Sequence, residues 1–207
     1  MDEGGQIDFS RLNPSRIKPS DSIVFLESAG IHTGGLPFAL AIADKCKKDG
    51  YLARVFGDNC FYGEALLRPV HSYVSVVAAC LKAGIDIRFA INFAEMGWRK
   101  LMCAPQPLTY RVCVLPPAQP IFNYILEYGG ISMRKAYQTF NMGAGFALFV
   151  AQGDEMKIVK LFQDEVEISG GWPFNVIYNA GYVEEGERRV VIKPRGIEFK
   201  GNRLAPR

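Results

Sequence analysis

The sequence predicts an α/β (α+β) fold, a mixed β-sheet with helices on at least one face. Hydrophobic residues make up 49% of the 207 positions, enough to bury a substantial core. Short apolar runs typical of strands interleave with segments of helical spacing, and glycine or proline stands at many of the junctions. The segments do not follow a strict strand–helix–strand rhythm, so a mixed sheet is favoured over an all-parallel one.

The first part of the chain predicts one strand and one helix behind a lead-in segment. Residues 1–20 contain several glycines and prolines, and we expect them to lie outside the core. The run SIVFLES at 22–28 is a short apolar strand. From Leu36 onward apolar residues recur at helical spacing, lysines gather in the last turn, and Gly50 stands where the helix would end.

The middle of the chain predicts a second helix and two strands. Pro69 can begin a helix that Gly84 ends. Its apolar face would be formed by Val70, Tyr73, Val74, Val77, Ala78 and Leu81. Residues 85–94 and 110–116 have the composition of strands, and two prolines end the second one.

The last part predicts three helices and four strands within a domain that spans residues 21–200. The helices are 121–130, 133–140 with Ser132 as its N-cap, and 155–165 with Asp154 as its N-cap. The strands are 142–153, 176–184, 188–193 and 197–201. Residues 201–207 would form a basic, solvated tail.

The composition argues against several classes of function. Basic and acidic residues, 24 and 21, are well mixed and give a net charge of +3, so we expect no nucleic-acid or membrane partner. Five scattered cysteines and two histidines, His32 and His71, do not have metal-ligand spacing, so we expect no metal site. Isolated thiols are typical of a reducing compartment, and we expect a cytoplasmic protein.

The segment SAGIHTGGLPF at 28–38 is a candidate binding loop. A strand that feeds His32, Thr33, Gly34 and Gly35 into a helix presents backbone N–H groups and the positive end of the helix dipole, which suit a phosphate or carboxylate. His32 would add a charge-assisted bond when protonated. Gly35 would tolerate no β-branched residue if its backbone conformation is closed to other residues. Such loops also serve only to turn the chain, and the pattern alone leaves both interpretations open.

Two further segments place polar groups beside glycine at the edge of an apolar element, as binding loops on a rigid scaffold do. They are FYGEALLRPVHSYV at 61–74 and AYQTFNMGAGFALFV at 136–150. The lone Cys60, just before the first of them, has no histidine at a known distance, so no nucleophile is assigned and the catalytic residues stay unknown.

At these motifs the chain resembles the C-terminal domain of the aminoimidazole ribonucleotide synthetase family, also called phosphoribosylformylglycinamidine cyclo-ligases. The motifs are I-x-P-G-D at 17–21, S-S-G-L-H-S-N-G ending at 35, Y-G-E-x-L-L-x-P at 62–69, and T-F-N-M-G-x-G at 139–145. Ser20 and Gly34 replace a glycine and an asparagine of the family pattern. Order and spacing agree over nearly all of residues 17–193, and the superfamily also includes a hydrogenase maturation factor.

The resemblance implies a substrate-side domain or subunit of an enzyme that closes a ring with ATP in purine biosynthesis. The implied site for the ribonucleotide and its phosphate is formed by His32, Thr33, Gly34, Gly35, Asn141 and Gly143. The implied contact with an ATP-binding domain or separate subunit is formed by Tyr62, Gly63, Glu64 and Pro69. No cofactor is expected in this chain, because ATP and magnesium would be held by that N-terminal domain. We also expect an oligomer.

Two departures from the family pattern keep an alternative open. The family has a glycine triplet after an A-H-I-T strand, where this chain reads FAINFAEMG at 89–97. The chain also starts where the family's second domain starts, so it would be either a fragment or the small subunit of a split enzyme. The alternative is a non-catalytic regulatory or scaffolding relative. Tyr73 could be a core residue, and Asn141 could only bond the backbone at a turn.

Overall fold

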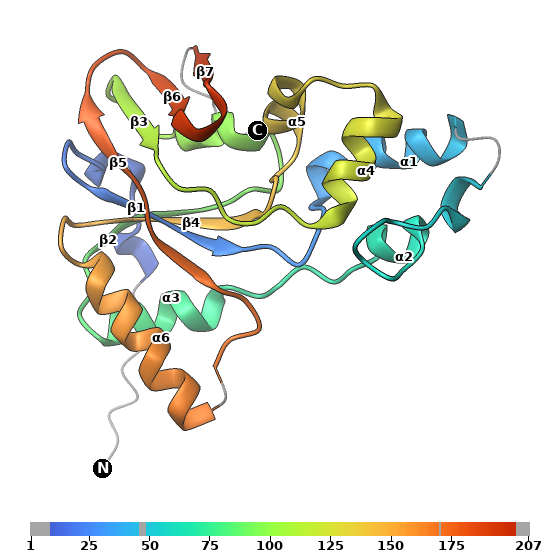
Figure 1. The fold of residues 1–207 in the computed structure, drawn as a ribbon. Helices are drawn as coiled ribbons and strands as arrows, with labels where there is room; N and C mark the ends of the chain where they lie inside the picture. The colour runs from blue at the N-terminus through green and yellow to red at the C-terminus, as the bar shows by residue number, and fades with distance from the viewer. Residues whose placement is uncertain (1–8, 46–48, 170, 202–207) are drawn as a thin grey trace.

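The computed structural model describes residues 9–45, 49–169 and 171–201. Their seven-stranded sheet has the order β2-β4-β1-β5-β3-β6-β7 (Figure 1). β3 and β6 are parallel and all other neighbours are antiparallel, which confirms the predicted mixed sheet. The strands are β1 (Ser22–Glu27), β2 (Ile87–Asn92), β3 (Leu108–Val112), β4 (Ala144–Val150), β5 (Val176–Glu185), β6 (Arg189–Ile192) and β7 (Ile197–Lys200).

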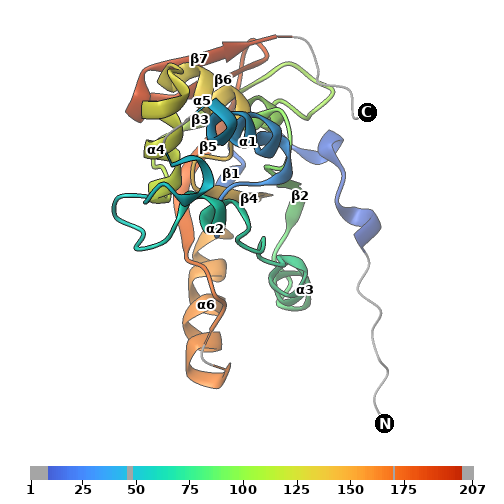
Figure 2. The same ribbon diagram turned by 90° about the vertical axis from the view of Figure 1, so that its right-hand side faces the viewer.

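Helices cover both faces of the sheet. They are α1 (Leu36–Lys45), α2 (Tyr62–Leu66), α3 (Val74–Lys82), α4 (Pro120–Gly129), α5 (Met133–Thr139) and α6 (Glu155–Ser169), with short 3₁₀ turns η3 (Thr33–Gly35), η4 (Gly50–Leu52) and η5 (Gly97–Leu101). Figures 1 and 2 show α1, α4 and α5 on one face and α3 and α6 on the other.

β1, an interior strand of the sheet, has one core layer on each of its faces. Ile23 and Phe25 pack with residues of α1, α2, α4 and α5, whereas Val24 and Leu26 pack with residues of α3 and α6. This is the alternation expected of a strand that is buried on both faces. β1 is therefore rigidly held, and the loop that follows it starts from a fixed point.

The predicted helix start at Pro69 is wrong, because α3 begins only at Val74. Its predicted apolar face is right in part: Tyr73 and Val77 are buried, whereas Val70 and Val74 are exposed. The physical reason is that α2 packs in one core layer and α3 in the other. The connection 67–73 has to cross from one face of the sheet to the other, and a continuous helix could not do so.

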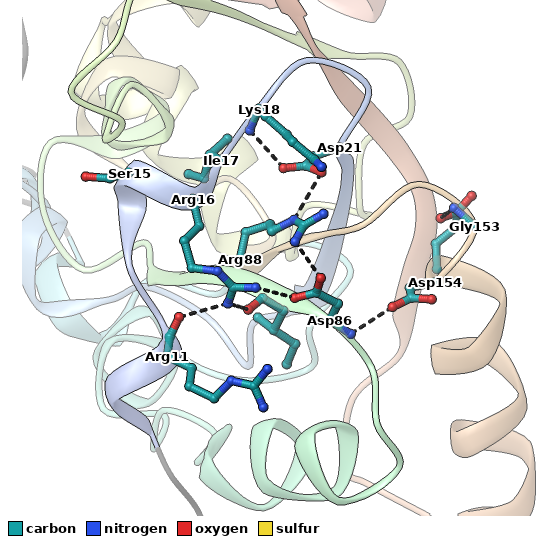
Figure 3. Close-up of polar contacts among 12 residues, drawn as sticks. Arg11, Ser15, Arg16, Ile17, Lys18, Asp21, Asp86, Arg88, Gly153 and Asp154 are labelled. Atoms are coloured by element: carbon teal, nitrogen blue, oxygen red, sulfur yellow. Dashed lines mark hydrogen bonds and ion pairs between the residues drawn. The ribbon is translucent and has the colours of Figure 1, made fainter.

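The segment before β1 is more firmly attached than the lead-in prediction allows. Ile17 is fully buried in the main core, so the prediction that residues 1–20 lie outside the core is wrong there. Arg16 Nη2 lies 2.6 Å from Asp86 Oδ1, and Arg88 bridges Asp86 and Asp21 (Figure 3). These ion pairs join the segment to β2.

The helix caps follow the prediction fully at one place and in part at the other. Ser132 caps α5 by accepting the Lys135 N–H at 3.2 Å, as expected. Asp154 stands directly before α6 as predicted, and its carbonyl accepts the Ile158 N–H, but its carboxylate accepts the Asp86 N–H at 2.7 Å (Figure 3). The carboxylate also pairs with Lys157 at 2.6 Å, so it joins α6 to the start of β2. β3 begins two residues before the predicted strand and ends at Val112.

Parts of the predicted lead-in and tail, residues 1–8 and 202–207, lie outside the described residues, as do two of the lysines expected in the last turn of the first helix, at 47 and 48. No described helix is both long enough and apolar enough to cross a membrane.

Candidate functional site

Loops from distant parts of the sequence meet at the end of the sheet where β1 and β2 finish. The Ser28 N–H donates to the Gly143 carbonyl at 2.9 Å, and Asn141 Nδ2 donates to the Gly30 carbonyl at 2.8 Å. Gln119, just before α4, also bonds Ser28. The structure thus joins the predicted loop 30–35 to the predicted residues Asn141 and Gly143.

Asn141 is a clamp inside this cluster. It is buried, its Oδ1 accepts the Gly143 N–H at 3.2 Å, and its carbonyl accepts the Trp98 indole N–H at 2.9 Å. Gly143 has φ +98° and lies against the Pro117 carbonyl, where a Cβ would not fit. These two residues hold the loop in place, with the polar groups of the Asn141 side chain bonded within the protein.

The glycines of the loop owe their identity to close packing. Gly34 N–H donates to the Ala94 carbonyl at 2.6 Å, and Gly35 N–H donates to the His32 carbonyl at 3.0 Å. Two of the amides expected to face an anion are therefore used internally. Gly35 does not have positive φ, so the backbone reason expected for it is wrong; a Cβ there would lie 2.2 Å from Cδ1 of Phe140. Thr33 and Gly34 remain exposed.

His32 lies beneath this exposed edge, with only 3% of its surface accessible. Its Nδ1 is 3.2 Å from Oδ1 of Asn92, at the end of β2. Its Nε2 has no hydrogen-bond partner among the described residues. Burial lowers the pKa of His32, and the Asn92 contact offsets this only in part. A neutral ring at neutral pH does not provide the charge-assisted bond to phosphate that the sequence suggested.

Lys100, in η5, is a cation at this edge that the sequence reasoning missed. Its Nζ donates to the Asn92 carbonyl at 2.8 Å, and its charge further lowers the pKa of His32. Burial lowers the pKa of Lys100 itself, while Glu95 opposes that effect. Lys100 keeps two further N–H donors, and it stands at the end of the FAINFAEMGWRK segment where β2 gives way to a turn.

A second group of polar residues, Tyr73, Glu27 and Asn175, lies at the end of β1 on the α3 side. The Tyr73 hydroxyl donates to the Glu27 carbonyl at 2.7 Å, and Asn175 Nδ2 donates to the Glu27 carboxylate at 2.8 Å. Tyr73 is buried and stacks on Phe146, which confirms its prediction as a core residue. His71 is half-buried, close enough to Glu27 for that carboxylate to raise its pKa, although burial lowers it more.

The predicted interface residues take different places. Tyr62 is fully buried, and its hydroxyl donates to the Ala39 carbonyl at 2.9 Å. The prediction that Tyr62 contacts another domain is therefore wrong for this structure. The Glu64 carboxylate accepts the Phe61 N–H at 2.7 Å and caps α2. Gly63 lies half-buried against Tyr51, whereas Pro69 is exposed.

Other apolar side chains of the same region are exposed instead. Phe56 is 98% exposed, Leu67 83% and Leu52 72%, and Val70 and Val74 lie near them in the chain. We call these five residues the apolar surface. A cavity of about 350 Å³ is lined by Arg54, Val55, Phe56, Gly57, Asn59 and Cys60. In the described parts of the chain, no three histidine, cysteine, aspartate or glutamate side chains lie together as metal ligands.

Comparison with known proteins decides the relationship. The chain is 31% identical over 173 residues to a phosphoribosylformylglycinamidine cyclo-ligase of Methanococcus maripaludis strain C6, a match that covers 77% of this chain and 49% of that enzyme. The chain is a relative of the phosphoribosylformylglycinamidine cyclo-ligases. The Methanothermobacter thermautotrophicus enzyme is 29% identical over 80% of the chain, and the Methanopyrus kandleri enzyme is 29% identical over 95%.

The chain spans about half the length of the curated cyclo-ligases that it matches. Among solved structures it is similar to Escherichia coli HypE, a hydrogenase maturation protein, with a TM-score of 0.52 at 12% identity, over 94% of this chain and 53% of that one. This likeness supports a shared fold. No family model matches the chain.

Proposed function

We propose that this chain is the substrate-side half of a phosphoribosylformylglycinamidine cyclo-ligase-like enzyme. The main support for the proposal is that the chain is similar in sequence to about half the length of the cyclo-ligases. A second support is that hydrogen bonds of Asn141 and Ser28 join the two motif loops. In the intact family, ATP activates the formyl amide oxygen, and an internal amine then closes the ring and expels phosphate. ATP and magnesium would be held by the other half, a domain or a separate cytoplasmic subunit.

The ribonucleotide would lie on the exposed edge formed by Thr33, Gly34 and Lys100. Lys100 supplies positive charge there, with two N–H donors left for phosphate oxygens. The Gly34 and Gly35 amides contribute less than the sequence suggested, because each donates to a carbonyl of the chain itself. His32 lies below the edge as an uncharged group.

The other half of the enzyme would dock on the apolar surface. Exposed large apolar side chains cost free energy in water. Several of them stand in the two chain segments on either side of α2, which favours an interaction site there. Leu67 and Pro69 end the FYGEALLRP motif, so the proposed docking surface includes part of the segment for which the resemblance implies a contact. The contact residues shift from Tyr62 to exposed residues such as Leu67 and Phe56.

One observation favours the non-catalytic alternative. Where the family has a glycine triplet, Phe93 is buried against Phe25 and Trp98, and the Ala94 carbonyl lies so close to Gly34 that a Cβ there would be 1.9 Å away. The added bulk occupies the position where glycine would let a ligand approach the backbone. A regulatory relative would keep the fold and the docking surface without turnover.

The test is calorimetry with phosphoribosylformylglycinamidine as the titrant. Binding by the chain is expected, and Lys100→Met should weaken it by roughly tenfold or more, because a charge-assisted bond contributes about 1.5–3 kcal/mol. Lys82→Met, at the end of α3, is the matched control. Absence of nucleotide binding, or equal affinities of the two variants, would refute the proposed site.

Turnover separates the two candidate functions. The chain is mixed with the separately produced ATP-binding half of the Methanothermobacter relative, magnesium and ATP, and phosphate release is followed. The chain alone is expected to bind no magnesium-ATP. Release that depends on the nucleotide substrate supports the enzyme, whereas complex formation and nucleotide binding without release support the regulatory alternative.

A further inference from the structure

The two ring nitrogens of His32 are in different situations. Nδ1 is 3.2 Å from the Asn92 side-chain oxygen, whereas Nε2 is buried with no hydrogen-bond partner in the described part of the chain. The Phe93 backbone also favours a protonated ring, but it forms no hydrogen bond to Nε2. Buried polar atoms of native proteins usually have partners, and an exception at the base of a candidate site points to a ligand.

The Asn92 contact fixes the form of the ring. An amide oxygen only accepts hydrogen bonds, so the proton of a neutral imidazole lies on Nδ1, and Nε2 keeps its lone pair. Asn92 is itself held, because its backbone pairs with Phe146 of β4 and its carbonyl accepts the Lys100 ammonium. The ring orientation therefore follows from two secondary-structure elements.

The surrounding charges favour the same state. Lys100 and His71 both disfavour a positive charge on His32. The nearby carboxylates have other partners, since Glu27 accepts two bonds from Asn175 and Glu95 acts on Lys100. None of the largest influences on the pKa of His32 comes from a carboxylate.

We infer that Asn92 is a positioning residue that holds His32 as a neutral hydrogen-bond acceptor, and that the ligand group bound at Nε2 is an N–H or O–H donor. The ligand class rests on the proposed ribonucleotide site and deepens it. The phosphate of the ligand would bind Lys100 at the edge, and an amine, amidine or hydroxyl of the same molecule would donate a hydrogen bond to His32. Nε2 is covered in the unliganded protein, so a ligand has to displace part of its cover to reach it.

The experiment is long-range nitrogen–proton correlation NMR of the uniformly labelled 207-residue chain. It has two histidines, so His71→Ala assigns both rings, and His71 serves as an internal reference. At pH 7.5 the His32 ring should show a protonated Nδ1 and a bare Nε2, and it should become charged only below the pH at which an ordinary histidine does. A protonated Nε2, or a charged ring at pH 7.5, would overturn the inference.

Variants of Asn92 distinguish positioning from a merely structural role. Asn92→Ala should remove the preference for the Nδ1-protonated form and lower the pKa of His32 further, since the Asn92 bond raises it. Asn92→Asp should restore the preference, because a carboxylate also only accepts, and should raise the pKa. Asn123→Ala, exposed on α4, is the control. An unchanged His32 spectrum in Asn92→Ala would overturn the positioning role.

The ligand class is read from the same spectrum. Saturating phosphoribosylformylglycinamidine should move the Nε2 resonance of His32 while the proton stays on Nδ1, and its affinity should fall tenfold or more when acid charges the ring. Tighter binding at acid pH, or a proton gained at Nε2 on binding, would overturn the ligand class. If the free ring is as expected but calorimetry detects no nucleotide binding, the proposed function fails while the role of Asn92 stands.

Discussion

Gly35 offers a quantitative test of how tightly the candidate binding loop is packed. A Cβ at this position would lie 2.2 Å from Cδ1 and 2.6 Å from Cε1 of Phe140. Contacts this short do not persist, so the ring or the loop has to move. The Phe140 ring is buried and makes T-shaped contacts with Phe38 and Phe122, at centroid distances of 5.8 and 6.2 Å, so it has little room to move.

Gly35→Ala is expected to destabilise the protein by about 1–3 kcal/mol, the usual cost of forcing a methyl group into a filled core. For a chain of 207 residues, a loss of about 1 kcal/mol lowers the melting temperature by about 2–4 °C, so the expected shift is about 2–12 °C. The free energy of unfolding would be measured by urea titration followed by circular dichroism. Gly30→Ala is the control, because its nearest neighbour, Cβ of Arg68, is 3.6 Å away.

Phe140→Leu supplies the second half of a double-mutant cycle. Removing the ring edge should make Gly35→Ala less costly when Phe140→Leu is also present, with a coupling energy of about 0.5–3 kcal/mol. The reasoning is refuted if Gly35→Ala and Gly30→Ala lose the same stability, or if the cost of Gly35→Ala does not depend on the side chain at position 140.

Three further predictions follow from the buried charges and the exposed apolar residues. His32 has a lowered pKa in the folded protein, so the unfolded chain binds more protons below about pH 6.5. The free energy of unfolding, measured by urea titration, should therefore fall as the pH is lowered from about 7.5 to about 5.5. In His32→Gln this fall should be smaller. Arg88→Met leaves Asp21 buried without its ion-pair partner and should cost roughly 3 kcal/mol, whereas adding Asp21→Asn should recover part of that loss; no recovery would contradict the pairing. Leu67→Ser should change stability by less than about 0.5 kcal/mol yet weaken binding of the ATP-binding half in calorimetry, and equal affinity would remove Leu67 from the docking site.

The elements that the sequence predicted well have local signals. The run at 22–28 formed β1 because its residues are apolar on both faces. α4 is followed by the C-cap Gly130, which adopts the left-handed conformation that glycine favours. Ser132 was recognisable as a cap because capping uses atoms within four residues of each other. In each case the cause of the structure lies inside the segment.

The misplaced elements have causes elsewhere in the chain. Residues 67–73 stay irregular because they connect two faces of a sheet whose arrangement is set by other strands. Ile17 is buried by core residues that come much later in the sequence, and the Asp154 carboxylate accepts the N–H of the distant Asp86. Helical spacing and capping preferences contain no information about these distant partners.

The candidate site shows the same division. The loop containing His32 was visible as a glycine-rich turn between a strand and a helix, and the Asn141 motif through its resemblance to the family. Lys100 and Asn92 could not be assigned to that site from the sequence. Only the order of the strands shows that β2 and β1 end at the same edge of the sheet, on either side of β4. The signal in the sequence is the polar residues of the NFAEMGWRK segment at 92–100, which starts in the last residues of the predicted strand.

The interior position of β1 has a consequence for how the protein is made. Ser22 pairs with Val150 on one side and with Tyr182 on the other, so the partners of the first strand leave the ribosome long after the strand itself. Contacts of such long sequence separation close slowly. Until β5 has emerged, β1 exposes an unpaired edge and the loop after it has no fixed starting point. We therefore expect the loop after β1 to reach its folded form only once Tyr182 has been synthesised.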